Sequence, residues 1–286
     1  MPELPEVHAL VADLGSRLVG RAVHRFDVLS FAALKTFEPP AAALAGGTVV
    51  GVARHGKFID FSIGDIHLVV HLARAGWIRW FEAVPASSGR PGRGPVAARL
   101  VLDDGTGFAI TEAGTKKNLA LYVVRDPSEV PGIARLGPDP LDTAFTRDVF
   151  AGILAAAGRS QIKGVLRDQG TIAGIGNAYS DEILHTAKMS PFKPASMGAE
   201  EASRLYDAVI STLEQAVARA DGLAASDLKK EKKLNLQVHG RAGLACPVCG
   251  DTVRQVRFAD SSLEYCPTCQ TGGKPLADRV LSRLLK

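Results

Sequence analysis

The sequence predicts an α+β fold in which a β-rich first part, a helical middle and a small cysteine hairpin follow one another. Three observations predict it. Short apolar runs separated by turn residues fill positions 21–125, apolar residues recur at helical spacing over 146–220, and all four cysteines lie within 246–269. Several short strands at such spacing are typical of a β-sandwich or a β-barrel.

A helix is expected at the start of the chain, over residues 5–19, with Pro5 in its first turn and Gly20 at its end. Its apolar positions at helical spacing are Val7, Leu10, Val11, Leu14 and Leu18. The preceding MPELPEV places Pro2 directly after the initiator methionine. One interpretation is a helix start whose acidic residues suit the helix dipole. The other is chemical: removal of the methionine would leave Pro2 as a free secondary amine.

The β-rich part contains seven runs with strand character, and the helical part contains four helices. The runs cover 22–29, 48–56, 57–63, 66–72, 76–81, 98–110 and 119–124, and the helices 146–157, 161–168, 177–188 and 198–220. The stretch PASSGRPGRGP, residues 85–95, predicts a mobile loop. Four prolines between 127 and 140 indicate a hinge between domains.

The cysteines form two Cys-x-x-Cys pairs, and this spacing is typical of a structural zinc site. The four ligands are Cys246, Cys249, Cys266 and Cys269. Two disulfides are the alternative, which an intracellular chain disfavours. Four cysteines leave no open position for catalysis, and a hairpin this short would draw much of its folding free energy from the metal.

Composition bounds the remaining possibilities. The 286 residues carry a net charge of +4, which permits nucleic-acid binding without proving it. We expect a cytoplasmic, nucleoid-associated protein, because no secretory signal and no membrane-length apolar run is evident. Lysines gather at 229–233, a run that commonly marks only a solvated face. The histidines show no ligand spacing, and no metal is assigned to them.

A glycine-rich turn precedes the predicted helix at 177. In AGIGN, Gly174 and Gly176 would let backbone N–H groups approach an anion, and Asn177 could add a donor. The third glycine of a dinucleotide fingerprint is absent. Taken alone, the turn is a weak signal.

Together, PELPEV, GKF with Lys57, QIKGVLRDQGTIAGIGNAYSDEIL and the cysteine hairpin resemble the formamidopyrimidine-DNA glycosylase/endonuclease VIII family from Pro2 to Gln270. The resemblance implies an N-terminal β-sandwich flanked by helices, a helix–two-turn–helix domain and a zinc-ribbon hairpin, with damaged DNA as the partner. The expected divisions are a catalytic domain at 2–134, a linker at 135–145, a DNA-binding domain at 146–239, a zinc finger at 240–270 and a basic tail at 271–286.

The resemblance also implies roles for individual residues. The amine of Pro2 would attack C1′ of the damaged nucleotide, Glu3 would be the acid/base carboxylate, and Glu6 matches a second glutamate. Lys57 and Asn177 match groups that hold the phosphates on either side of the damaged nucleotide. The resemblance also makes Lys57 a candidate catalytic residue. Arg241 in His-Gly-Arg resembles the family's Tyr-Gly-Arg and is a further DNA-contact candidate.

Three positions depart from the family pattern. Arg74 stands where a methionine is frequent, and could intercalate or merely be a surface residue. The Arg-Arg-Phe loop is replaced by Thr115, Lys116, Lys117 and Asn118, and the finger's arginine aligns with Ser261. Losing these contacts predicts a preference for single-stranded, bubble or abasic DNA, in which flipping a nucleotide costs less.

We therefore expect a monomeric, bifunctional DNA glycosylase and abasic-site lyase that needs one structural Zn²⁺ and no small-molecule cofactor. The alternative is a DNA-binding protein of the same family with little or no base excision. A zinc-ribbon transcription factor would explain only the last part of the chain. The tail is expected to form a basic amphipathic helix with Leu276, Val280, Leu284 and Leu285 on one face.

Overall fold

The computed structural model describes residues 1–85, 94–258 and 261–277, and the chain divides into two compact units. Unit 1 comprises Met1–Leu136 and Ala220–Leu228, and unit 2 comprises Gly137–Arg219 and Lys229–Lys286. Most of the predicted mobile loop and the end of the predicted tail helix lie outside the described residues. Among the described residues, no helix combines the length and apolar character that crossing a membrane requires.

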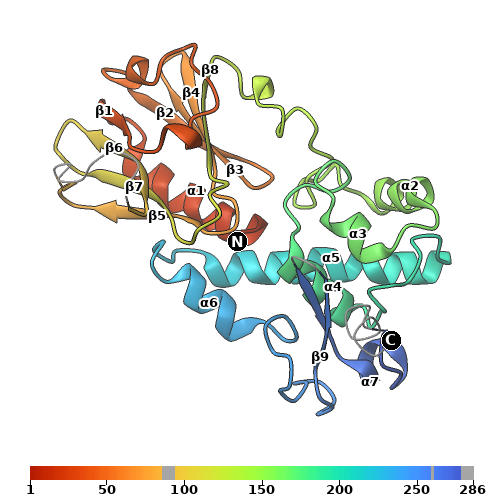
Figure 1. Ribbon diagram of the computed structural model, residues 1–286. Coiled ribbons are helices and arrows are strands. Elements are labelled where there is room, and N and C mark those ends of the chain that lie inside the picture. Colours follow the sequence, from red (N-terminus) through yellow and green to blue (C-terminus); the bar gives the residue numbers. More distant parts are fainter. Residues whose placement is uncertain (86–93, 259–260, 278–286) are drawn as a thin grey trace. The chain divides into compact units, whose positions relative to one another are not determined.

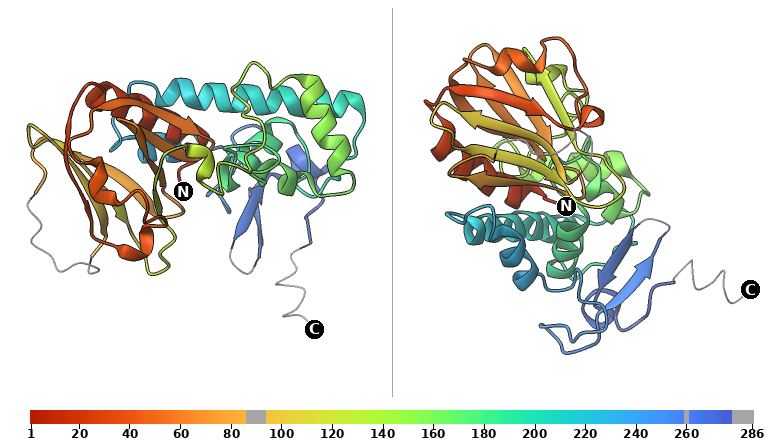
Figure 2. Two further views of the ribbon diagram at one scale, coloured as in Figure 1. Left: turned by 90° about the horizontal axis from the view of Figure 1, so that it is seen from above. Right: turned by 60° about the vertical axis from the view of Figure 1, so that its left-hand side comes forward.

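Unit 1 is a β-sandwich with one helix packed on it (Figures 1 and 2), as the sequence predicts. One sheet has the strand order β1-β6-β7-β5 and the other β2-β3-β4-β8. The elements are α1 (Leu4–Leu18), β1 (Val23–Val28), β2 (Val49–His55), β3 (Phe58–Ile63), β4 (Ile66–His71), β5 (Gly76–Phe81), β6 (Val96–Leu102), β7 (Gly107–Glu112) and β8 (Ala120–Val124). Short 3-10 helices lie at Phe31–Ala33, Ala41–Leu44 and Pro127–Glu129.

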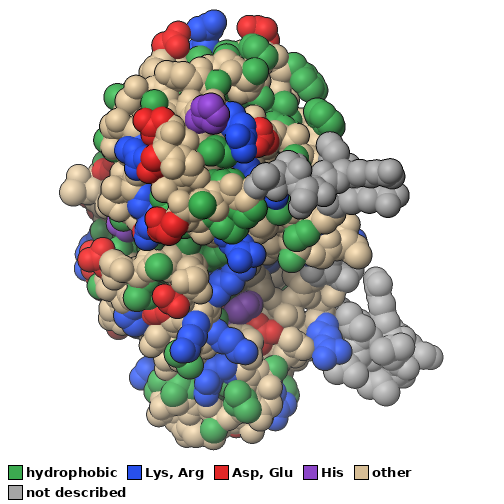
Figure 3. All heavy atoms as spheres, turned by 90° about the vertical axis from the view of Figure 1, so that its left-hand side faces the viewer, with side chains coloured by type: hydrophobic (Ala, Val, Ile, Leu, Met, Phe, Trp, Pro, Cys, Tyr) green, Lys and Arg blue, Asp and Glu red, His purple; other side chains and the backbone are tan. Residues whose placement is uncertain are grey.

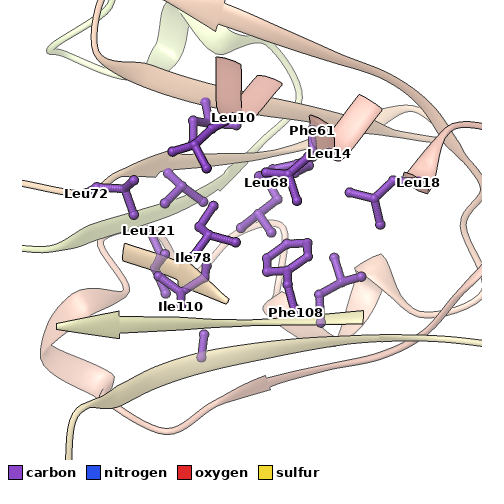
Figure 4. Close-up of a cluster of buried hydrophobic side chains, with 14 of the residues drawn as sticks. Leu10, Leu14, Leu18, Phe61, Leu68, Leu72, Ile78, Phe108, Ile110 and Leu121 are labelled. Carbon is purple, nitrogen blue, oxygen red and sulfur yellow. The ribbon is translucent and has the colours of Figure 1, made fainter. Parts of the chain in front are cut away.

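The core of unit 1 lies between the sheets and under α1. Phe61 of β3 and Phe108 of β7 stack with ring centroids 5.3 Å apart, so the two sheets meet at these rings. Helix α1 buries its apolar stripe against this core, because Leu10, Leu14 and Leu18 follow helical spacing (Figure 4). The returning segment Ala220–Leu228 completes the unit, and its Ala225 carbonyl accepts a bond from Trp77 Nε1 at 3.0 Å.

Unit 2 begins with a helical part whose four predicted helices are all confirmed. They are α2 (Arg147–Ala157), α3 (Ile162–Arg167), α4 (Asn177–Thr186) and α5 (Ala199–Ala220). The α2 N-terminus is capped by Thr146, whose hydroxyl accepts from the Val149 N–H at 3.3 Å. Two further helices were not predicted, α6 (Leu228–Asn235) and α7 (Pro267–Thr271). The lysine run at 229–233 is therefore helical.

The cysteine hairpin closes the described chain. Its strands β9 (Arg254–Arg257) and β10 (Ser262–Tyr265) pair antiparallel, with Leu263 opposite Val256. A small apolar cluster of Val256, Leu263 and Tyr265 supports them, and Leu276 packs against it. Residues 274–277 are not helical, and the rest of the predicted tail helix lies outside the described residues.

Candidate functional site

Strand register brings several candidate residues of unit 1 to one end of the sandwich. Phe58 at the start of β3 and Ala120 at the start of β8 both pair with His71 at the end of β4. In the other sheet, Gly76 at the start of β5 pairs with Glu112 at the end of β7. The turns at 56–57, 72–75 and 113–119 therefore lie at the same end.

The N-terminal turn of α1 lies at this end as well. In Figure 4, Leu10, midway along α1, lies nearer the end of the core that holds Leu72, while Leu18, the last residue of α1, lies at the opposite end. Leu72 directly follows β4. The described part of unit 1 thus places Pro2, Lys57 and Arg74 at one end of the sandwich, although they are far apart in sequence.

Glu3 and Glu6 form the N-terminal cap of α1. Glu3 is the N-cap residue in extended conformation, and its backbone N–H donates to Glu6 Oε2 at 2.8 Å, half of a capping box. Both carboxylates are buried, at 2% and 3% exposure. Pro2 is buried, whereas Met1 remains 46% exposed. The cap uses the N–H of Glu3, so removing Met1 would leave it intact.

Lys57 occupies the two-residue turn of the β2–β3 hairpin. Gly56 takes a φ of +55°, which favours glycine and lets His55 pair directly with Phe58. Lys57 is only 7% exposed. Burial, together with the positive charge of Lys57, lowers the pKa of His71 to about 4, so this imidazole is neutral near pH 7. The ring of His71 lies 4.6 Å from that of Phe58.

Arg74 and the loop after β7 also contribute cations at this end. Arg74 is exposed and follows Ala73, whose φ of +49° is unusual for a residue with a Cβ. After β7, Glu112 Oε1 accepts from the N–H groups of Asn118 and Leu119 at 2.7 and 2.9 Å. Lys117 donates to the Glu112 carbonyl. The loop is therefore ordered by its own polar contacts.

In unit 2, the glycine-rich turn before α4 is held by Gln169. Its Oε1 accepts from the Gly174 N–H at 3.0 Å, and its Nε2 donates to the Ile175 carbonyl at 2.7 Å. Asn177 begins α4 and donates from Nδ2 to the Ser262 carbonyl of β10 at 2.7 Å. Within the described part of the chain, its Oδ1 is buried without a hydrogen-bond partner. An amide carries two N–H donors, and the bond to Ser262 uses one of them.

The other basic candidates of unit 2 differ in exposure. Arg241 is half-buried, and its Nε is buried with no hydrogen-bond partner among the described residues. Arg241 donates from Nη2 to the Ala245 carbonyl at 3.4 Å, at the entrance to the hairpin. The predicted finger position is filled by Ser261, which is neutral. Helix α6 exposes most of its lysines, and Lys232 lies 4.5 Å above the ring of Tyr179. In Figure 3, Lys and Arg side chains gather on the lower part of the face shown.

The four cysteines meet as the sequence predicts. Their sulfurs all lie within 4.8 Å of one another, with Cys246 to Cys269 at 3.9 Å and Cys249 to Cys266 at 3.3 Å. Tetrahedral Zn²⁺ with Zn–S bonds of about 2.3 Å requires sulfurs about 3.8 Å apart, so the cluster fits the ion. Burial raises the pKa of Cys266 to about 11, and a bound cation would reverse that shift.

A buried polar network on α4 was not foreseen. Lys163 Nζ donates to Asp181 Oδ1 at 2.7 Å, and His239 Nδ1 donates to Asp181 Oδ2 at 2.8 Å. Glu182 accepts three backbone N–H groups of residues 237–239. The sequence indicates this network only weakly, through charged residues such as Lys163 and Asp181 that lie within predicted helices. His185 Nε2 of α4 also lies 3.3 Å from Cys246 Sγ. The spacing of the cysteines gives no indication of this contact.

Comparison with known proteins explains this combination. Residues 1–115 match the formamidopyrimidine-DNA glycosylase N-terminal domain, 136–227 its H2TH domain, and 243–272 the zinc finger found in FPG and IleRS. A formamidopyrimidine-DNA glycosylase of Thermus thermophilus is 35% identical over 285 residues, covering 96% of this chain and 100% of the relative. The chain belongs to the formamidopyrimidine-DNA glycosylase family.

Other relatives agree with this assignment. A Mycobacterium tuberculosis protein described as an uncharacterized formamidopyrimidine-DNA glycosylase-like protein is 58% identical over 152 residues, covering 53% of this chain and 94% of the relative. The crystal structure of the MutM (Fpg) protein from Thermus thermophilus matches with a TM-score of 0.79 at 32% identity, over 96% of this chain and 100% of that one. The structure of a complex between the Lactococcus lactis Fpg and DNA that contains an abasic site matches with a TM-score of 0.81 at 26% identity. The match covers 94% of this chain and 99% of that one.

Membership in this family confirms the predicted α+β architecture and places the chain among the DNA glycosylases of base-excision repair. The zinc-finger match and the cysteine geometry together show one structural Zn²⁺ site. Sequence spacing identified that site in full. It did not identify the network around Asp181.

Proposed function

We propose that the chain is a bifunctional DNA glycosylase and abasic-site lyase whose nucleophile is the amine of Pro2 after removal of Met1. With Met1 attached, the Pro2 nitrogen is an amide and cannot act as a nucleophile. Met1 is exposed, so it is accessible for removal. An α-amine has a pKa near 8, so a usable fraction is neutral at cellular pH.

The proposed reaction has two stages. The Pro2 nitrogen bonds to C1′ as the glycosidic C1′–N bond breaks, and the departing base takes a proton. The C1′–O4′ bond of the sugar then breaks, the ring oxygen takes a proton, and C1′ and the Pro2 nitrogen form an iminium. This iminium accepts the electrons left when the C2′ proton is removed, and the 3′ phosphate leaves (β-elimination). A second elimination releases the 5′ phosphate (δ-elimination). Glu3 supplies the carboxylate that protonates the ring oxygen and moves protons between these stages.

The position of Glu3 is the observation that carries this proposal. Glu3 adjoins the amine in sequence, and its backbone is fixed by the bond to Glu6 Oε2 at 2.8 Å. Through this bond Glu6, also a candidate catalytic residue, would keep Glu3 beside the sugar. A protein that only binds DNA has no need of a free proline amine beside this carboxylate.

DNA binding would use cations and donors of both units. Lys57 and Arg74 lie at the same end of the sandwich as Pro2, and the second amide N–H of Asn177 would bind a phosphate. Arg241 is the further candidate at the entrance to the hairpin. The loop 113–118 offers Lys116 and Lys117 but no aromatic wedge, so we propose a preference for single-stranded, bubble or abasic substrates.

Borohydride trapping on an abasic oligonucleotide tests the enzyme. We expect a covalent adduct with the mature chain and a weaker one with Pro2→Gly, whose primary amine can still form an imine, while Pro5→Ala, a change three residues away within α1, keeps the adduct. A chain that retains an N-terminal extension should fail to trap, and mass spectrometry should show Met1 absent from active preparations. If the mature chain forms no adduct with duplex, bubble or single-stranded DNA, the chain is a DNA-binding member of the family without base excision. The departures at Arg74, 115–118 and Ser261 favour that alternative.

A further inference from the structure

Asp181 is the centre of a charge network that the proposed chemistry does not use. Its carboxylate is completely buried in the middle of α4. Oδ1 accepts from Lys163 Nζ of α3 at 2.7 Å, and Oδ2 accepts from His239 Nδ1 at 2.8 Å. A carboxylate in such a place is costly unless it is paired with a cation or fully hydrogen-bonded.

The second carboxylate of the network belongs to β10 of the zinc hairpin. Glu264, only 2% exposed, accepts on Oε1 from Gln255 at 2.7 Å and from Ser262 Oγ at 2.9 Å. Its Oε2 lies 2.9 Å from His239 Nδ1, within ion-pair distance. The hydrogen bond of that nitrogen goes to Asp181, and Oε2 has no hydrogen-bond partner among the described residues. Its backbone N–H donates to Asp181 Oδ2 at 3.2 Å. The imidazole of His239 therefore faces one carboxylate from the helix and one from the hairpin.

The geometry favours a protonated His239. Glu182 is satisfied by three backbone N–H groups, and Lys163 pairs with Asp181. Among the described residues, an imidazolium at His239 is then the cation that lies beside Glu264. The charged groups that face the ring are Asp181 and Glu264, with Lys163 behind Asp181, and the carboxylate of Glu182 bonds to the backbone of His239. Burial lowers the pKa of His239, but its interactions with both carboxylates outweigh burial and raise that pKa to about 9.

The same strand contacts α4 a second time, one helical turn earlier. Asn177 Nδ2 donates to the Ser262 carbonyl at 2.7 Å, and Ser262 lies two residues before Glu264 in β10. Positions 177 and 181 share one face of α4. The orientation of the Asn177 amide, and of its second N–H, therefore depends on the register of β10 along α4.

We propose that His239 is a positioning residue: its imidazolium joins Asp181 of α4 to Glu264 of β10 and so fixes the zinc hairpin, and with it Asn177, for binding a DNA phosphate. The phosphate step rests on the proposed function. The fixing of the hairpin does not, and it can be measured without DNA. A divalent cation held by the same three side chains is the competing explanation, because their ligand atoms lie within 4.8 Å of one another.

The first test uses the full zinc-loaded chain, with His239→Gln as the variant and His24→Gln, on the exposed side of β1, as the control. Hydrogen exchange should accelerate in β9 and β10 of His239→Gln while α2 is unchanged, and His24→Gln should match the wild type. In the wild type, NMR titration should give His239 a midpoint near 9. A normal midpoint for His239, or unchanged exchange in β10, overturns the proposal. So does a second bound metal ion that His239→Gln loses.

The second test measures binding to a duplex that carries a tetrahydrofuran abasic analogue. We expect His239→Gln to bind about tenfold more weakly at pH 7, as for a lost hydrogen bond between charged groups. Asp181→Asn should weaken binding similarly, and the double variant should be no worse than either single one. The affinity of the wild type for this duplex should fall as the pH rises through 9, because His239 loses its proton there. The affinity of His239→Gln should show no such fall. Additive losses, or the same pH profile in both proteins, contradict the positioning role. If the wild type binds no DNA while exchange in β10 still depends on His239, the proposed function fails and the positioning role stands.

Discussion

Replacing Lys163 by methionine should destabilise unit 2 by about 3–5 kcal/mol, the range for removing one partner of a buried ion pair. The side chain is 7% exposed, and its ammonium bonds to Asp181 Oδ1, Ser180 Oγ and the Asn177 carbonyl at 2.7, 2.6 and 3.1 Å. The first bond is charged and worth roughly 1.5–3 kcal/mol, and each neutral one roughly 1 kcal/mol. Methionine fills the volume and leaves Asp181 buried with His239 as its remaining cation.

The two units can be observed separately. Both tryptophans, Trp77 and Trp80, belong to unit 1, so tryptophan fluorescence during urea unfolding should not change in Lys163→Met. Hydrogen exchange of α3 and α4 should report the loss in unit 2. The double variant Lys163→Met/Asp181→Asn should recover part of the loss, because it leaves no buried carboxylate uncompensated. A single variant within 1 kcal/mol of wild type, or a double variant that shows the sum of both single losses, would refute this account.

Two further predictions concern the metal and the pH. Removing zinc with a strong chelator should abolish exchange protection at 244–271 while the tryptophan fluorescence stays constant; a hairpin that stays protected would mean that the metal does not fold it. Unit 1 should lose stability as the pH falls from 6.5 towards 4, because the pKa of His71 is depressed to about 4 in the folded state and protonation there is resisted. His71→Phe should flatten this acid limb of the fluorescence-monitored unfolding profile and His24→Phe should not.

The sandwich and its helices could be predicted because their signals are local. Alternating apolar residues bounded by turns such as Asp103-Asp104-Gly105 define strands within a few residues of their true ends. Helix α6 could not be predicted in this way, because its lysines carry no apolar stripe. It is stabilised instead by distant contacts, among them the burial of Leu228 and the bond from Arg219 to Glu231 at 3.0 Å.

The same distinction separates the two parts of the candidate site. The zinc ligands lie in two close pairs, so their spacing alone predicts the metal. The partners of Asp181 are Lys163, His239 and Glu264, which lie in three other segments of unit 2, and no spacing rule connects them. Convergence of Lys57 and Arg74 near the N-terminus likewise depends on strand register, which follows from pairing across both sheets.

Two supports of different physical kind therefore act on the zinc hairpin. Zinc closes the base of the hairpin, where its own apolar cluster of Val256, Leu263 and Tyr265 is too small to fold it. Two hydrogen bonds, from Asn177 to the Ser262 carbonyl and from the Glu264 N–H to Asp181, fix the side of β10 to α4, and the ion pair of His239 with Glu264 adds to them. Loss of zinc should unfold the hairpin, whereas loss of the imidazolium should leave it folded and free to shift along α4. Because a phosphate contact depends on the position of its donor, the second change should weaken DNA binding in a protein that keeps all its zinc.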